Sequence, residues 1–181
     1  MSSLNLYKKI TKADQVNKEG GYKNVIYWAP VSTFTSIKGP TVTPTVLGDT
    51  LKITSAHTFP VDEGFISWLC KLHSVTGTAQ TTGDEGAQSL HHTYKFTLIG
   101  DDASTLEQLK GMLNDNCIFL IKDSNCLGTA AYVQLGDECL SPTCKIQFDG
   151  KTTKEGLKEY MVEIDVKEKK FYYSSTITEK P

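Results

Sequence analysis

Residues 94–123 of the 181-residue chain, YKFTLIGDDASTLEQLKGMLNDNCIFLIKD, predict a continuous strand–helix–strand unit. Tyr94, Phe96 and Leu98 alternate with polar residues at the period of a half-buried strand, and a glycine and two aspartates then end the pattern. Residues 117–121, CIFLI, are all apolar but too few for a helix, so we expect a strand buried on both faces. This unit is the framework around which the rest of the chain is expected to pack.

The middle of the unit predicts the one helix of the chain. Ser104 and Glu107 have the spacing of a capping box, and Asp101 and Asp102 place negative charge at the positive end of the helix dipole. The helix is expected to end at residues 114–116, NDN. The face predicted to pack on the core carries three leucines, Leu106, Leu109 and Leu113.

In addition to the strand at 117–121, alternating or short apolar runs predict strands at 22–28, 51–54, 66–75, 90–99, 130–135, 144–148, 160–167 and 171–177. The fold class is therefore mainly β with one packed α-helix (α+β), a rolled β-sandwich or barrel with the helix closing one face or end. Residues 1–21 are predicted to be an arm ahead of a single β-rich domain at 22–181. The proline-punctuated connection at 30–44 has little apolar area, so it is either disordered or held by another surface.

The strands at 66–75 and 90–99 flank residues 76–89, TGTAQTTGDEGAQS, which contain three glycines and almost no apolar side chain. We therefore expect a long hairpin with an extended, flexible loop at 76–89, longer than ordinary hairpin loops.

Composition argues against several classes of protein. The basic residues number 19 against 21 acidic ones, and all are lysines, so the bidentate arginine fork that reads guanine or phosphate is missing. Five cysteines, an odd number, imply no disulfide framework. No apolar run is long enough to span a bilayer, and the first residues have no apolar signal core, which favours synthesis in a reducing cytoplasm.

No pattern in the sequence predicts catalysis, a metal or a cofactor. Cys126, Cys139 and Cys144 could be combined with His91 and His92 into a zinc site, but the tight CxxC spacing of structural sites is absent. The two histidines are expected on opposite sides of a strand. Neither a nucleophile elbow nor a glycine-rich phosphate loop occurs, so we expect a protein that is not an enzyme.

Polar side chains recur on one face of several predicted strands. Two interpretations stay open: a solvent-exposed face of a sandwich, or the wall of a water-filled channel in a ring assembly. The candidate channel-facing residues are Ser67, Lys71, His73, Thr93, Lys95, Thr97, Glu159, Glu163 and Asp165.

The order of these elements resembles the tail-tube (major tail protein) family of tailed bacteriophages and related injection machines. The matching stretches are the hairpin at 64–99 with its 76–89 tip, the helix at 102–114 and the strands within 117–177. The resemblance implies a structural virion protein that self-assembles into rings, commonly hexamers. The rings stack into a tail tube, or form a tube-like head–tail junction, through which DNA passes during ejection.

The resemblance also implies partners and a location. The protein would be made in the bacterial host cytoplasm, become part of the virion tail, and contact other copies and further tail or neck proteins, with non-specific passage of DNA and no membrane. The family's channel tends to be acidic, which Glu159, Glu163 and Asp165 would suit and Lys71 and Lys95 would not. The hairpin loop would reach a neighbouring subunit through Thr78, Gln80, Thr82, Asp84, Glu85 and Gln88.

Two hypotheses from other classes remain. A monomeric β-sandwich recognition module, for example one that binds glycans, could present Trp28, Tyr27 and Trp68 as an exposed aromatic platform. A small enzyme on a β scaffold ranks lowest, because no nucleophile and base can be paired in the sequence.

Overall fold

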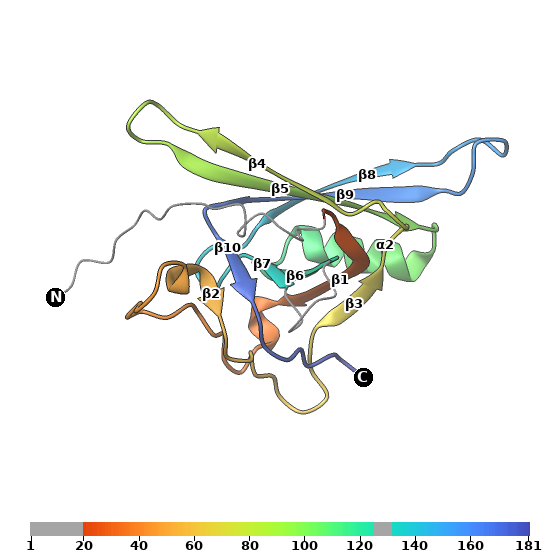
Figure 1. Cartoon of the computed structure of the whole chain (residues 1–181). Coiled ribbons are helices and arrows are strands. Elements are labelled where there is room, and N and C mark those ends of the chain that lie inside the picture. Colours follow the sequence, from red (N-terminus) through yellow and green to blue (C-terminus); the bar gives the residue numbers. More distant parts are fainter. Residues whose placement is uncertain (1–19, 125–131) are drawn as a thin grey trace.

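The computed structural model describes residues 20–124 and 132–181, which form two β-sheets packed face to face with one α-helix beside them (Figure 1). The larger sheet has the order β2-β10-β7-β6-β1-β3. Its strands are β1 (Tyr22–Pro30), β2 (Lys52–Ile53), β3 (Ile66–Leu69), β6 (Cys117–Asp123), β7 (Tyr132–Leu135) and β10 (Lys170–Tyr173). The prediction of a mainly β fold with one α-helix is confirmed.

The smaller sheet has the order β4-β5-β9-β8 and is antiparallel throughout. Its strands are β4 (Thr76–Thr82), β5 (Ser89–Ile99), β8 (Thr143–Asp149) and β9 (Glu159–Lys167). The β4–β5 and β8–β9 hairpins project beyond the body of the molecule in opposite directions (Figure 1). We call the two projections the β4–β5 ribbon and the β8–β9 ribbon.

The strand–helix–strand unit predicted from residues 94–123 joins the two sheets. It comprises β5, the helix α2 (Ala103–Leu113) and β6. The five residues 117–121 of β6 are at most 1% exposed, as expected for a strand buried on both faces. In the part of the chain that the structure describes, the other helical turns are two short 3₁₀ segments, η1 (Val31–Thr33) and η2 (Asp49–Leu51).

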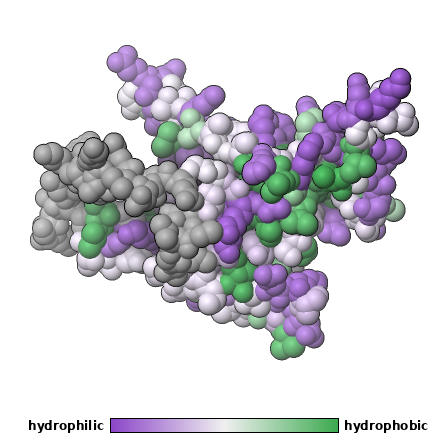
Figure 2. All heavy atoms as spheres, turned by 45° about the vertical axis from the view of Figure 1, so that its right-hand side comes forward, coloured by the Kyte–Doolittle hydropathy of each residue, from purple (hydrophilic) through white to green (hydrophobic). Residues whose placement is uncertain are grey.

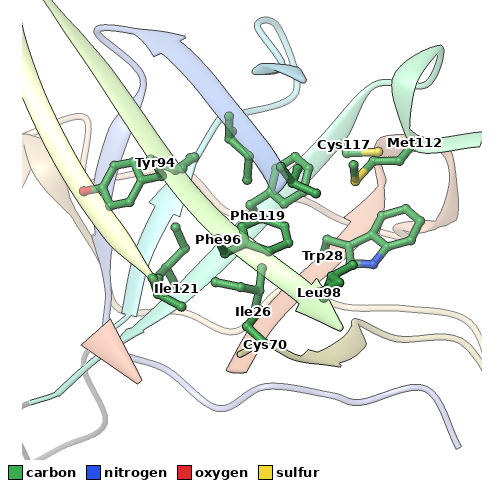
Figure 3. Packing of buried hydrophobic residues seen from close by; sticks show 14 of the residues in the cluster. Ile26, Trp28, Cys70, Tyr94, Phe96, Leu98, Met112, Cys117, Phe119 and Ile121 are labelled. Atoms are coloured by element: carbon green, nitrogen blue, oxygen red, sulfur yellow. The ribbon is translucent and has the colours of Figure 1, made fainter. Parts of the chain in front are cut away.

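The main core fills the space between the sheets (Figure 3). Alternate residues of β5 and β9 point into it, and Phe119 and Ile121 of β6 meet them from the opposite sheet. The other face of β6 contributes Ile118 and Leu120 to a second cluster on the far side of the six-stranded sheet. Each side of β6 is therefore needed to bury a separate apolar layer.

The helix differs from its predicted cap and packing face. Its N-cap is Asp102, whose carboxylate accepts the Thr105 backbone N–H at 2.9 Å, and not Ser104, whose hydroxyl donates to the same carboxylate. The buried side chains are Leu109 and Met112. Two predicted packing residues lie about a quarter-turn around the helix from that pair and stay partly exposed, Leu106 at 36% and Leu113 at 43%.

The predicted hairpin is wrong in its first strand and in its loop. Strand β3 ends at Leu69 and pairs with β1 in the six-stranded sheet, and the chain turns at His73, with φ of +60°, before entering the other sheet as β4. Residues 76–82, expected as loop, are paired with β5 along their whole length, which leaves 83–88 as the turn. The absence of apolar alternation was misleading because both faces of β4 are exposed, whereas its threonines favour a strand.

Smaller differences occur near the ends. Strand β10 ends at Tyr173 rather than at residue 177. The arm predicted at 1–21 lies outside the described residues except for its last two positions, as do the first two residues of the strand predicted at 130–135.

The connection at 30–44 is held by the outer face of the six-stranded sheet. Phe34 packs on the ring of Phe59, with centroids 4.4 Å apart, over the second cluster. His57, 2% exposed, lies beneath the connection and accepts the Lys38 backbone N–H at Nδ1 over 3.0 Å. The chain's own sheet therefore holds the part of the connection up to Lys38, whereas Val42 further along is 97% exposed.

Hydrogen bonds fix the charge state of His57. The Gln134 amide donates from Nε2 to the Gly136 carbonyl, so its Oε1 accepts from His57 Nε2 at 2.9 Å. With Nδ1 occupied as an acceptor, the ring must be neutral. Burial lowers the pKa of His57, in agreement with this arrangement.

We predict that His57 makes the fold less stable at mildly acidic pH. A histidine with a lowered folded-state pKa binds more protons when unfolded, so the free energy of unfolding decreases as pH falls below the unfolded value of about 6.5. Urea unfolding from pH 7 to pH 5 should show a smaller decrease for His57→Gln than for the native chain. An unchanged slope in His57→Gln would contradict the assignment.

We also predict opposite effects for two glycine-to-alanine substitutions. A Cβ at Gly77 would lie 2.4 Å from the buried Tyr94 ring, so Gly77→Ala should lower the free energy of unfolding by about 1–3 kcal/mol. A Cβ at Gly111 in α2 meets nothing within 4 Å, so Gly111→Ala should raise it by about 0.5–1 kcal/mol. Chemical denaturation measures both; equal effects would refute the packing of Tyr94 across β4.

Candidate functional site: the outer face and open edges of the four-stranded sheet

The face of the four-stranded sheet that points away from the core carries aligned rows of polar side chains. Strand register places Lys95, Glu163 and Lys145 side by side on β5, β9 and β8. The neighbouring row holds Thr93, Asp165 and Thr143. Period-2 alternation sends the intervening residues into the core, so this outer face is formed by one half of each strand.

Ion pairs join these rows across three strands. Glu163 contacts the ammonium groups of Lys95 at 2.5 Å and Lys145 at 3.1 Å, and Lys145 also reaches Asp165 at 2.9 Å. Hydrogen bonds from Lys95 and Lys145 lower the pKa of Glu163. Partial burial opposes ionisation of Asp165, but hydrogen bonds from Thr93 and Lys145 outweigh it, so the pKa of Asp165 is lowered as well. Both carboxylates are therefore charged and neutralised at neutral pH.

A second charged cluster lies at the end of the face nearest α2. Glu159 is only 8% exposed because the ammonium groups of Lys71 and Lys151 cover it, at 2.8 Å and 3.4 Å. The hydrogen bond from Lys71 is the largest effect that lowers the pKa of Glu159. Lys151 also pairs with Asp149, which is the last residue of β8.

The structure brings most of the predicted channel-facing residues together. Thr93, Lys95, Thr97, Glu163 and Asp165 share the outer face. Lys71 reaches Glu159 there from the turn before β4, and His73 lies in the same turn. Ser67 does not belong with them, because it lies on β3 in the six-stranded sheet.

Strand β8 also contributes to the outer face, as do two further residues that were not predicted from the sequence. The odd-numbered residues of β8 alternate outward, and this period-2 pattern in 143–149 could have identified them. The missed residues are His91, Thr143, Lys145, Gln147 and Met161.

Strands β4 and β8 are the edges of this sheet, and neither has a second strand partner within residues 20–124 and 132–181. All seven residues of β4 are exposed, and none is charged or a proline, the residues that commonly protect an edge. On β8, the Lys145 ammonium points away from the sheet edge, toward Glu163 and Asp165 of β9. The sheet thus has two open edges.

The predicted loop residues fall into two groups. Thr78, Gln80 and Thr82 are on β4 and share the outer face, because they pair with Thr93, His91 and Ser89 of β5. Asp84, Glu85 and Gln88 are exposed in the turn at 83–88. A shallow hollow on the outer face lies between Gln80, Thr82 and the Lys145–Asp165 pair.

The aromatic platform considered for a recognition module does not form, because Tyr27 packs on the second cluster, on the other face of β1 from Trp28, and Trp28 itself is buried. Trp28 is 5% exposed and packs against Trp68, with ring centroids 5.0 Å apart. The Trp68 indole N–H donates to Gln108 of α2 at 3.2 Å. The two tryptophans therefore connect β1 and β3 to the helix.

Other chemistry is sparse in the described ranges. They contain no group of three or more His, Cys, Asp or Glu side chains placed to hold a metal ion. Burial raises the pKa of Cys70, Cys117 and Cys144 to about 12, which keeps these thiols protonated. Cys126 of the weak zinc pattern lies outside the described residues. None of the described helices is long and apolar enough to cross a membrane.

Comparison of the chain with models of protein families, with curated proteins and with solved structures finds no match in any of the three.

We predict that Lys145 holds down the pKa of two carboxyl groups at once. In Lys145→Ala the pKa of both Glu163 and Asp165 should rise, because each loses a charged hydrogen-bond donor. Carbon-13 NMR titration of the side-chain carboxyl groups measures this directly. Lys167→Ala on the same face should leave the pKa of both carboxyl groups unchanged. If neither pKa rises in Lys145→Ala, the ion pairs of the charged row are refuted.

Proposed function

We propose that the protein is a structural subunit that self-assembles into rings, as in a phage tail tube or a tube-like head–tail junction, with the four-stranded sheet lining the channel. The observation that carries the proposal is a sheet with one buried apolar face, one polar ion-paired face and two open edges. Such a sheet can extend through copies of itself without exposing its apolar side. The order of a hairpin, a helix and further strands, on which the resemblance to tail-tube proteins rests, also supports the proposal, although the hairpin begins at residue 76 and not at 64.

The strand directions favour cyclic closure. In an antiparallel sheet of four strands, the two edge strands run in opposite directions, so β4 of one copy can pair antiparallel with β8 of the next. Repetition by rotation then gives a barrel that is antiparallel throughout and has no free edge. A sheet with an odd number of strands would require a parallel junction at each subunit boundary.

The polar face is suited to a wall along which DNA moves without binding. Protein affinity for DNA comes largely from lysines and arginines that displace counterions from phosphates. Here Lys71, Lys95 and Lys145 are each held by a carboxylate of the same subunit, and the sequence contains no arginine. The wall we propose is therefore electrically balanced, in contrast to the acidic lining that the resemblance implies.

The β4–β5 ribbon also needs a partner. A two-stranded hairpin alone in water is marginally stable, and among the described residues no core lies beneath the outer part of this ribbon. Pairing of β4 with another copy would give the ribbon a third and a fourth strand. The recognition module has no comparable observation, because Trp28 is buried.

We predict that the ribbon is required for assembly but its turn is not. Replacing residues 80–91 with Asn-Gly joins the paired residues Ala79 and His92 through a two-residue turn and removes the outer ribbon. This variant should remain folded and monomeric in native mass spectrometry, whereas the native chain should form rings.

The matched control replaces only residues 83–88 with Asn-Gly, between the paired residues Thr82 and Ser89. Because both strands stay intact, rings should persist. Rings formed equally well by the variant without residues 80–91 would rule out β4 as an assembly edge.

A further inference from the structure

The inner side of the β4–β5 ribbon has no cover within the described residues. Ala79, Thr81 and Leu90 point in the same direction as the core residues of the sheet, but all three are exposed. They belong to the ribbon that projects from the body (Figure 1). Leu90 is 45% exposed although its backbone N–H and carbonyl both bond to Glu168, in the turn after β9. We call these three residues the ribbon underside.

A matching apolar surface lies beside the opposite edge of the sheet. Leu106 and Leu113 face outward from α2, which packs against β8. Between the end of α2 and the start of β8 is a hollow of about 390 Å³. Its apolar lining is Met112, Leu113, Pro142 and Cys144, and its polar rim is formed by residues 114–116, Ser141 and Thr143. In Figure 2, hydrophobic residues gather on this side of the molecule below the projecting ribbons, whose ends are hydrophilic.

We propose that the ribbon underside of one copy docks on α2 of the next copy, with Leu90 seated against Leu113 at this hollow. The proposal rests on the edge pairing proposed above and specifies the second contact of the same interface. The occupant is a second copy of this chain, because continuing the sheet past β8 places a neighbour's ribbon underside on the side where α2 lies.

The register of the junction between β4 of one copy and β8 of the next is limited by the alternation of side chains between the two faces of each strand. Strands β4 and β8 are each seven residues long, and full antiparallel overlap places Thr82 opposite Thr143 and Thr76 opposite Asp149. In this register Thr81 lies opposite Cys144, and both belong to the inner side of the sheet. If the register shifted by one residue, the ribbon underside would face the channel instead of the inner side of the sheet. If it shifted by two, residues at the ends of both strands would lose their pairing partners.

The same register brings Leu90 to the hollow. Leu90 pairs with Thr81 within the ribbon, so in the assembly it is level with Cys144 and about 10 Å away, two strand spacings. That distance is close to the width of a helix, and α2 is the helix that packs beside β8. No like charges meet along the junction, because β4 contains no charged residue.

Interface area supports a second contact. A stable interface buries roughly 800 Å² on each partner, and a seven-residue strand edge with small polar side chains supplies backbone hydrogen bonds but little apolar area. The ribbon underside and the flank of α2 add the apolar part. The exposure of two of the three leucines predicted to pack in the core is then explained by contact with another subunit.

The test uses charge at the two leucines. Leu90→Asp and Leu113→Lys should each raise the protein concentration at half-assembly tenfold or more, with an unchanged melting temperature because both side chains are exposed in the monomer. The double variant, which can form an ion pair across the interface, should recover much of the lost assembly. Val61→Asp, at a residue 88% exposed on a distant loop, should assemble as the native chain does.

Cross-linking tests the register. In a background without Cys139, Thr78→Cys with Gln147→Cys should form a disulfide between copies, whereas Thr78→Cys with Thr143→Cys should not. If native rings form and both leucine variants assemble normally, the docking is wrong while the ring function stands. If the native chain forms no ring at any concentration, the ring function and the docking both fail.

Discussion

The pairing of β5 with β9 is the interaction on which the rest of the structure depends. Nine residue pairs, from His91 with Lys167 to Ile99 with Glu159, fix which side chains of the four-stranded sheet point to the core. A slip of one residue would exchange Phe96 and Val162 for Lys95 and Glu163, which would bury charges and expose the apolar layer. The same ladder continues outward into the β4–β5 ribbon, so it connects the stability of the body to the edge proposed to join copies.

The charged rows of the outer face show how a polar surface can bind phosphates only weakly. Each carboxylate of β9 on this face is paired with lysines that come from the flanking strands or from the turn before β4. Surface ion pairs of this kind add little stability one at a time. Their consequence is electrostatic, because a lysine hydrogen-bonded to Glu163 or Asp165 is less available to a phosphate.

The sequence predicted what local periodicity controls and failed where tertiary position decides. The buried β6 run, the limits of α2 and the alternation of β9 followed from residue pattern alone. Strand β4 was missed because an edge exposed on both faces has no apolar period, and β3 was joined to it because Trp68, Cys70 and Leu72 continue the alternation through a turn. Only packing shows that Leu109 and Met112, rather than Leu106 and Leu113, contact the core. The channel-facing set was found in part: the period-2 pattern of 143–149 pointed to Lys145 but was overlooked, and only the strand pairing shows that Lys145 lies beside Glu163.

The claim that the four-stranded sheet closes through copies of itself is tested most directly by electron microscopy of the purified native chain, with native mass spectrometry across a concentration series. The account predicts closed rings or short tubes with a central channel, and masses at whole multiples of the subunit that increase with concentration. Monomers alone at every concentration, or assemblies without a channel, would contradict it.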